Sequence, residues 1–272
     1  MHDIVIRSGK VVDGTGKAIQ QMDIAIDNGL ITAVGNDIGE GRTEIDASNH
    51  LVTPGFVDVH THYDGQATWD PEMSPSSYHG VTTTVFGNCG VGFAPAQPDS
   101  HDWLIQLMEG VEDIPGAALA EGIEWNWETF PEYLDALEKM PRVMDIATQV
   151  PHGSVRAYVM GERGARNEDP TADDLIAMAQ IVQEGIEAGA LGFTSSRTML
   201  HRALDGEPVP GTFAGAEELI AMGKAVADAG GGVVEVASDI GLGGLEGNFG
   251  SDIDWMRALA NDYGLTVTYA LN

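Results

Sequence analysis

The chain has 272 residues, of which 42 are acidic and 13 are basic, so its formal net charge at pH 7 is −29. This charge excludes a protein that binds a nucleic-acid backbone, because binding to phosphates needs a basic face, and it argues against docking on an anionic membrane. A hydrophobic content of 43% is sufficient for a large buried core, so the acidic excess indicates a solvated surface rather than a disordered tail.

The sequence shows neither a membrane-spanning segment nor a signal peptide. It contains no run of about 18 apolar residues, and its N-terminus lacks the charged-then-apolar pattern of a secretion signal. The single cysteine, Cys89, cannot form an internal disulfide, so nothing demands an oxidising compartment. We therefore predict a cytoplasmic protein with one large domain, or with a large and a small one. The oligomeric state is left open.

Residues 1–53 have the pattern of a small β domain. Short runs of β-prone residues flank the dipeptides Asp13-Gly14 and Asn28-Gly29, which are typical of tight turns. This pattern predicts a small antiparallel β unit.

From Pro54 onward, short buried strands alternate with helical patterns. Thr129 and Glu132 have the spacing of a capping box and predict a helix over 131–140, and Thr171 with Asp174 predicts a longer helix that ends near Ala188. Strands that alternate with helices indicate βαβ units and a parallel sheet, and therefore the α/β fold class. The candidate strands are 56–59, 82–86, 145–150, 190–194, 232–236 and 266–269.

Six strands are two fewer than a closed (β/α)8 barrel requires. The sequence stops immediately after the sixth, and an exposed edge strand is a pairing hazard. We therefore expect residues 54–272 to form an incomplete barrel that is truncated at the C-terminus. A complete open sheet of six strands is the alternative.

The strongest chemical signal is the segment 57–62, an apolar strand that ends in His60-Thr61-His62. Residues i and i+2 of a strand point to the same side, about 6.5 Å apart along the chain. Two neutral imidazoles in this arrangement can bind one zinc-like cation, and the C-terminal end of a barrel strand is where active sites lie. The alternative is a pair of histidines that cap the strand through hydrogen bonds.

Cys89 follows the next predicted strand, in the sequence Gly87-Asn88-Cys89-Gly90. A thiolate beside a dication loses its proton readily and is a strong zinc ligand. The glycines allow the backbone to approach another group closely. A free cysteine is also common as a small buried apolar residue, and this alternative stays open.

Three further polar residues follow predicted strands and are candidates for substrate binding: His152, Arg197 and Asp64. Arg197 is suited to hold a carboxylate in a bidentate manner, although pairing with one of the many acidic residues is the alternative. Asp239 after the fifth strand is a weaker candidate, and five histidines have no partner that the sequence reveals: His2, His50, His79, His101 and His201.

The sequence resembles the amidohydrolase superfamily. The residues that carry this resemblance are Asp3, Gly9, Val12-Asp13-Gly14, Asp23, Gly29-Leu30-Ile31, Val34-Gly35, Ile45-Asp46-Ala47 and the segment 52–62. Within the superfamily it looks like the D-aminoacylase branch, the N-acyl-D-amino-acid deacylases. That likeness rests on the segments 80–85, 87–90, 152–161 and 187–194.

The resemblance implies a β-sandwich combined with a metal-dependent (β/α)8 barrel. It places His60, His62 and Cys89 on metal-ligand positions, for one or two divalent cations that are most often Zn²⁺. It implies a small-molecule substrate with a linear amide bond other than a peptide bond. The amide carbonyl would be attacked by metal-activated water.

The sequence departs from the family pattern at three places. The family has a metal-binding histidine at the end of the fifth strand and another at the end of the sixth, and the segments 234–239 and 269–272 have neither. The catalytic aspartate of the eighth strand would lie beyond residue 272. We therefore expect a fragment that is inactive by itself and whose metal set is altered. Two alternatives stay open: a non-catalytic metal-binding homologue, and a metal-free α/β domain that binds a small ligand.

Overall fold

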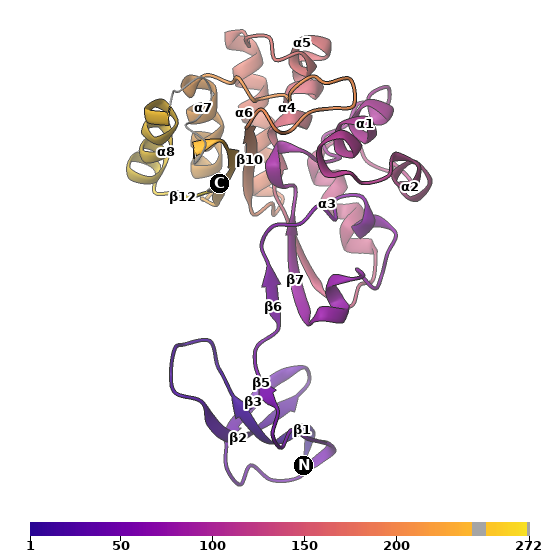
Figure 1. Ribbon diagram of the computed structural model, residues 1–272, viewed down its shortest axis with the longest axis vertical. Helices are drawn as coiled ribbons and strands as arrows, with labels where there is room; N and C mark the ends of the chain where they lie inside the picture. Colours follow the sequence, from indigo (N-terminus) through magenta and orange to yellow (C-terminus); the bar gives the residue numbers. More distant parts are fainter. Residues whose placement is uncertain (241–248, 271–272) are drawn as a thin grey trace. The chain divides into compact units, whose positions relative to one another are not determined.

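The computed structural model describes residues 1–240 and 249–270 (Figure 1). The chain divides into two compact units, Met1–Phe56 and Val57–Asn272, and each is described by itself. Among the described residues, no helix combines the length and the apolar character that crossing a bilayer requires.

The first unit is a single five-stranded sheet. Its strands are β1 (His2–Val11), β2 (Gln20–Asp27), β3 (Leu30–Gly35), β4 (Gly41–Asp46) and β5 (Leu51–Val52). The order is β3-β2-β1-β4, and β5 also pairs with β1. β1, β2 and β3 pair in antiparallel fashion, as predicted. The turn dipeptides predict no direction for β4 and β5, which run parallel to β1 because the chain crosses from β3 at one edge to the far side of β1.

The second unit contains two parallel sheets. One has the order β6-β7-β8 and the other β12-β11-β10-β9, and every register resolved within them is parallel. The strands are β6 (Phe56–Asp58), β7 (Val81–Phe86), β8 (Asp145–Thr148), β9 (Val150–Pro151), β10 (Gly192–Arg197), β11 (Val233–Ser238) and β12 (Thr266–Tyr269). All six predicted strand regions contain a strand. The α/β class is confirmed, and the described strands do not close into a barrel.

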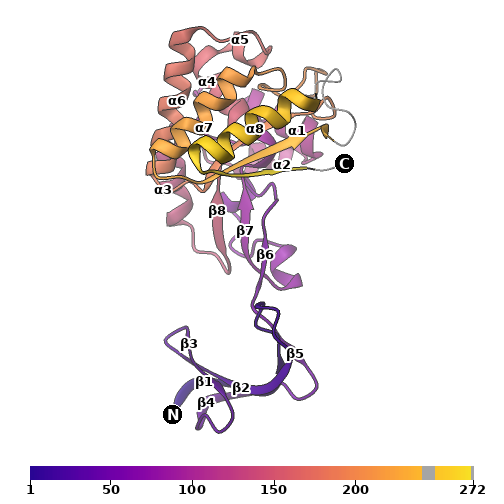
Figure 2. The same cartoon turned by 90° about the vertical axis from the view of Figure 1, so that its left-hand side faces the viewer.

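Helices follow most of these strands. They are α1 (His101–Glu112), α2 (Gly116–Gly122), α3 (Phe130–Lys139), α4 (His152–Met160), α5 (Glu162–Ala165), α6 (Ala172–Glu187), α7 (Ala216–Asp228) and α8 (Phe249–Tyr263), with short 3₁₀ turns η1 (Gln66–Thr68), η2 (Ser76–His79) and η3 (Asn88–Gly90). Helices α6, α7 and α8 lie side by side along the β9–β12 sheet (Figures 1 and 2). This is the βαβ arrangement that the alternation of strands and helices predicts.

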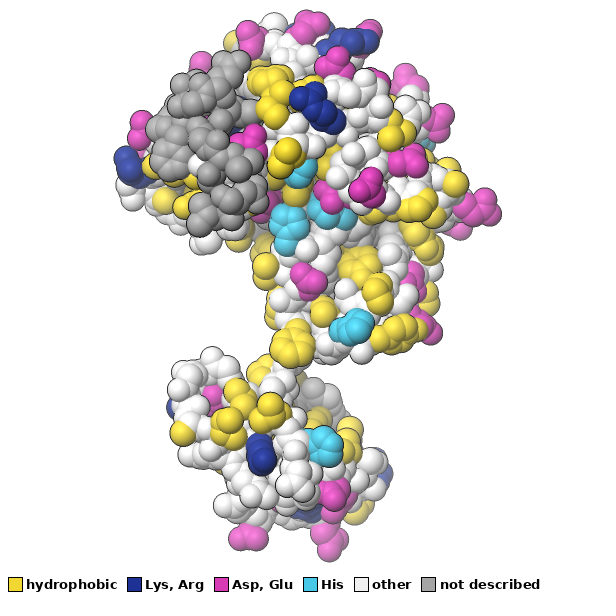
Figure 3. All heavy atoms as spheres, in the orientation of Figure 1, with side chains coloured by type: hydrophobic (Ala, Val, Ile, Leu, Met, Phe, Trp, Pro, Cys, Tyr) yellow, Lys and Arg dark blue, Asp and Glu magenta, His cyan; other side chains and the backbone are white. Residues whose placement is uncertain are grey.

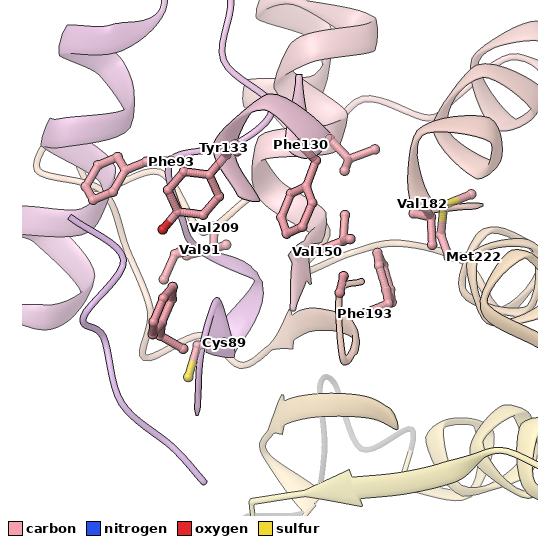
Figure 4. Packing of buried hydrophobic residues seen from close by; sticks show 14 of the residues in the cluster. Cys89, Val91, Phe93, Phe130, Tyr133, Val150, Val182, Phe193, Val209 and Met222 are labelled. Atoms are coloured by element: carbon pink, nitrogen blue, oxygen red, sulfur yellow. The ribbon is translucent and has the colours of Figure 1, made fainter. Parts of the chain in front are cut away.

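The core of the second unit lies between the strands and these helices (Figure 4). Val150 on β9 and Phe193 on β10 are fully buried. A Cβ atom at Gly185 of α6 would lie 2.6 Å from Cγ2 of Val150, so the missing side chain lets α6 pack directly on the strand. Close packing of this kind fixes the strand ends, from which the polar side chains of the site project.

Two helices begin at capping boxes, as the sequence predicts. At α6, the Asp174 amide donates to Thr171 Oγ1 at 3.2 Å, and the Thr171 amide donates to Asp174 Oδ2 at 2.8 Å. The α3 box joins Thr129 and Glu132 in the same way. Each box satisfies amide groups that the first helical turn would otherwise leave unpaired.

We expect Thr171→Ala to lower the free energy of unfolding by about 1 kcal/mol, because α6 then loses one of these bonds. Urea denaturation followed by circular dichroism measures the change. Thr171→Ser keeps the hydroxyl and serves as the control. Equal losses in the two variants would contradict a capping role.

Candidate metal centre

The segment His60-Thr61-His62 is hydrogen-bonded to β7 through its middle residue, Thr61. The Thr61 amide donates to the Val85 carbonyl oxygen at 2.9 Å, and Thr61 Oγ1 donates to the same oxygen at 2.7 Å. With Thr61 fixed in this way, the imidazoles of His60 and His62 lie together, with ring centroids 5.5 Å apart. β6 itself ends at Asp58, so the histidines project from the extended segment directly after it.

Cys89 lies in a tight turn after β7. Gly87, Cys89 and Gly90 all have left-handed backbone angles, with φ of 77°, 57° and 71°. A Cβ atom at Gly87 would lie 2.3 Å from the Gln149 carbonyl oxygen, so only glycine fits there. The Cys89 amide donates to Glu235 Oε2 on β11 at 2.9 Å. The turn therefore holds the thiol at the ends of several neighbouring strands, and Figure 4 shows its sulfur pointing away from the labelled aromatic residues.

The structure brings the three predicted metal ligands together. Nε2 of His60 lies 3.1 Å from Sγ of Cys89, and one donor atom from each of His60, His62 and Cys89 lies within 4.8 Å of the others. Figure 3 shows histidine side chains gathered on one face of the second unit. Two imidazoles and a thiol are a donor set that suits Zn²⁺. Their role as metal ligands remains a prediction.

The electrostatics of these side chains also fit a cation. Burial lowers the pKa of His62 to about 3, so its imidazole is neutral and able to act as a ligand. Its Nδ1 is buried and has no hydrogen-bond partner in the described part of the chain. Burial, together with nearby carboxyl groups, raises the pKa of the Cys89 thiol, and a bound dication would reverse that shift.

Three residues that the sequence did not assign to the metal site lie around the thiol. Glu235 Oε1 lies 3.9 Å from Nδ1 of His60, and Glu112 Oε1 lies 3.2 Å from Nε2 of His62. Cys89, Glu112 and His201 form a second group whose donor atoms all lie within 4.8 Å of one another. Burial raises the pKa of Glu112 and of Glu235 to about 7. No spacing motif in the sequence marks Glu112 or His201.

Comparison with known proteins identifies the family. The sequence model described as "Amidohydrolase family" matches residues 43–271, which is most of the chain. The chain belongs to the amidohydrolase family. Membership confirms the resemblance that the sequence indicated.

The relatives point to the D-aminoacylase branch. The chain is 31% identical to the D-aminoacylase of Alcaligenes xylosoxydans xylosoxydans over 195 residues, which are 71% of this chain and 37% of that protein. It is 34% identical to an uncharacterised protein of Mycobacterium tuberculosis over 225 residues, 78% of this chain and 36% of the relative. The chain thus spans little more than a third of the length of these curated amidohydrolase relatives.

A solved structure supports the fold. The crystal structure of N-acyl-D-glutamate deacylase from Bordetella bronchiseptica, complexed with zinc and a phosphonate inhibitor, matches with a TM-score of 0.76 and 27% identity. The match covers 98% of this chain and 50% of that chain. The expected fold class, a partial TIM-like barrel preceded by a β domain, is therefore confirmed as the fold of this amidohydrolase.

Asp64, a predicted substrate contact, lies two residues after His62 and is buried. Its backbone carbonyl oxygen accepts a 2.6 Å hydrogen bond from the Tyr133 hydroxyl. Burial raises the pKa of the Asp64 carboxyl to about 8, and its Oδ2 has no partner among the described residues. One oxygen of this buried carboxyl is therefore unsatisfied, close in sequence to the predicted metal ligands.

His152, the second predicted substrate contact, is fully buried at the start of α4. Its Nδ1 lies 2.9 Å from Ser195 Oγ and its Nε2 lies 2.9 Å from Glu218 Oε1. Glu218 also pairs with Arg156. The imidazole thus joins α4, β10 and α7 inside the protein, and a contact with substrate remains a prediction that no observation tests.

Arg197, the third predicted substrate contact, has several protein partners. Its guanidinium donates to Asp252 Oδ1 at 2.9 Å and to the carbonyl oxygens of Thr212 and Ala214 at 2.7 and 2.8 Å. These bonds join the end of β10 to α8 and to the segment before α7. The role of Arg197 in holding a substrate carboxylate remains a prediction. The carboxylate that Arg197 binds in the structure is that of Asp252 in the same chain.

A cavity of about 540 Å³ lies between α1, α4, α5 and the segment 203–210. Its lining includes Trp103, Tyr158 and Arg166, and none of the residues around the Cys89 thiol. It is therefore separate from the candidate metal centre.

We expect Gly87→Ala to lower the free energy of unfolding by about 3 kcal/mol. The added methyl group would combine an unfavourable positive φ with overlap against the Gln149 backbone. Gly206→Ala is the matched control, because Gly206 also has a positive φ but has open space around it. Its loss should be about 1 kcal/mol. Equal losses, measured by urea denaturation, would contradict the close approach at Gly87.

We expect His152 to make the protein less stable in mild acid. Burial lowers the pKa of His152 below its usual 6.5, so the unfolded chain binds the proton more tightly than the folded chain does. The contribution of His152 to the free energy of unfolding then falls as the pH drops below about 6.5. In His152→Gln this component is absent, so its unfolding free energy should change less between pH 6.5 and 5. His79→Asn changes an exposed histidine, so its free energy of unfolding should depend on pH as that of the unmodified protein does. The same pH dependence in all three proteins would refute the contribution of His152.

Proposed function

We propose that this amidohydrolase is a metal-dependent deacylase that hydrolyses the linear amide bond of small N-acyl-D-amino acids. The observation that carries the proposal is the cluster of His60, His62 and Cys89, whose donor atoms lie within 4.8 Å of one another at the strand ends. That position is where enzymes with parallel barrels build their active sites.

The chain's own residues prepare this site for a divalent cation, which we propose to be Zn²⁺. His60 and His62 would bind it through neutral imidazole nitrogens, and Cys89 through its sulfur. Glu235 orients the Cys89 turn by accepting the hydrogen bond of its amide. When bound, such a cation lowers the pKa of a coordinated water molecule and polarises an amide carbonyl.

Relatives support the choice of substrate. The Alcaligenes protein is named a D-aminoacylase and the Bordetella protein an N-acyl-D-glutamate deacylase, whose structure contains zinc and a phosphonate inhibitor. We propose Asp64 as the substrate-side polar group, because its Oδ2 is unpartnered among the described residues. His152 and Arg197 have buried partners, and we propose that they hold the segments around the site.

The test measures amine release from N-acyl-D-amino acids and their L-enantiomers. It uses the protein with any residues that its gene encodes beyond Asn272, stripped of metal and reloaded with Zn²⁺. We expect hydrolysis of the D-enantiomers that depends on Zn²⁺. His60→Asn and His62→Asn should each lower kcat/KM by about 100-fold or more, because a metal contributes several kcal/mol of transition-state stabilisation.

The exposed histidine variant His79→Asn is the control and should keep its activity. Zinc uptake without hydrolysis of any N-acyl amino acid would refute the deacylase and favour a non-catalytic metal-binding homologue. A well-folded protein that takes up no metal would refute the metal dependence itself and leave the metal-free ligand-binding domain.

A further inference from the structure

We propose that the cavity between α1, α4, α5 and the segment 203–210 binds a small organic cation, an ammonium ion that carries apolar groups. The cavity has a volume of about 540 Å³ and lies within the second unit. Its lining includes none of His60, His62 and Cys89. The inference therefore concerns a separate site and does not rest on the proposed function.

The walls of the cavity are held together by contacts that need no ligand. After α5, the Asn167 side chain donates through Nδ2 to the Pro208 carbonyl oxygen at 3.0 Å and accepts through Oδ1 from the Gly211 amide at 2.9 Å. A Cβ atom at Gly110 of α1 would lie 2.6 Å from the Arg202 carbonyl oxygen, so α1 packs directly against the backbone where the segment begins. The cavity is therefore preformed, as sites for small molecules usually are.

Aromatic and aliphatic side chains line much of the cavity. Trp103 and Leu107 are four residues apart in α1, so they lie on the same face of that helix. Tyr158 lines the cavity from α4, and its hydroxyl donates to Glu128 Oε1 at 2.9 Å. Because the hydroxyl proton has this partner, Tyr158 offers its ring to a ligand. The faces of tryptophan and tyrosine rings attract cations.

The charged side chains of the cavity are mostly acidic: Asp99, Glu162, Asp205 and Glu207 line it together with the single basic residue Arg166. Nε of Arg166 lies 3.1 Å from Glu162 Oε1. This hydrogen bond raises the pKa of Arg166, and the charges of Glu207 and Asp205 add to the effect. One guanidinium thus faces several carboxylates, and the excess negative charge favours a cation over an anionic ligand.

The carboxylates of the cavity are not placed to chelate a metal ion. Among the described residues, two groups of histidine, cysteine and acidic side chains have three donor atoms within 4.8 Å of one another, and both contain Cys89. Neither group includes a residue of the cavity lining. Separated carboxylates beside aromatic rings suit a larger ion whose charge lies among alkyl groups, and aromatic side chains bind quaternary ammonium ions in this way.

The experiment titrates benzyltrimethylammonium into the protein and measures the heat of binding by calorimetry. It uses the chain with any residues that its gene encodes beyond Asn272, in about 0.15 M salt, which screens the diffuse charge of the acidic surface. We expect saturable binding of one ion per chain. Benzyl alcohol keeps the aromatic ring but lacks the charge, so it should bind at least about 10-fold more weakly.

Variants test the two kinds of wall separately. Trp103→Leu should weaken binding about 10-fold, whereas Trp103→Phe keeps a ring and should weaken it less than about 3-fold. Asp205→Asn combined with Glu207→Gln should weaken binding about 5-fold, because two carboxylates of the cavity lose their charge. Asp135→Asn combined with Glu121→Gln is the matched control. It removes the same charge from exposed positions outside the cavity and should leave the affinity unchanged.

The absence of saturable binding would overturn the proposal, and so would equal affinity for benzyl alcohol. Equal losses of affinity in the two double variants would mean that the ion binds the acidic surface in general, which also overturns it. Unchanged affinity in Trp103→Leu would exclude the cavity as the site. Circular dichroism checks that each variant folds, and if Trp103→Leu does not fold, the comparison of the two double variants decides.

A titration of the Zn²⁺-loaded protein separates this inference from the proposed function. The ion should bind equally well with and without Zn²⁺, and equally well to His60→Asn, because the cavity does not include the candidate metal centre. Competition with Zn²⁺ would place the ion at the metal centre and overturn the cavity site, while leaving the deacylase intact. Binding in the cavity would stand even if no N-acyl amino acid is hydrolysed.

Discussion

The candidate metal centre depends on one buried side chain amide, that of Asn88. Its Nδ2 donates to the carbonyl oxygens of Thr61 and Val85, each at 3.1 Å, and its Oδ1 accepts from Gln149 Nε2 at 2.8 Å. These bonds connect the histidine segment, the end of β7 and the link between β8 and β9. Because Asn88 also precedes Cys89, one residue sets the distance between the two imidazoles and the thiol. A fully buried amide that loses these partners would leave several polar groups unsatisfied.

The buried carboxyl groups around the thiol favour the proposed cation over a neutral ligand. Asp64, Glu112 and Glu235 are carboxyl groups whose pKa values burial raises to about 8, 7 and 7. In the described residues, the nearest basic side chains that pair with Glu112 and Glu235 are the histidines of the same cluster. Burying acids in this way destabilises the fold unless positive charge accompanies them. A dication bound in the cluster, as proposed, would offset that cost and would stabilise the fold.

Local features of the fold could be predicted from the sequence, whereas the full set of polar side chains around the thiol could not. The Thr171–Asp174 capping box and the alternation of strands and helices are encoded within short stretches, so their positions follow from spacing alone. Cys89 was found because it directly follows a predicted strand. Glu112 and His201 follow no such rule: one ends a helix and the other lies in a loop. Their meeting depends on the close approach of Gly110 in α1 to the backbone at Arg202 and Ala203, which no local pattern reveals.

The side chains around the thiol are held in place by two kinds of contact. His60, His62 and Cys89 project from segments attached to the β7 strand, which close packing keeps rigid. Glu112 and His201 depend instead on the contact between α1 and the loop after β10, and on the bonds that Asp239 makes to that loop. Helix ends and loops open at lower free energy than core strands do. The contact between Glu112 and His201 therefore opens at lower free energy than the contacts among His60, His62 and Cys89.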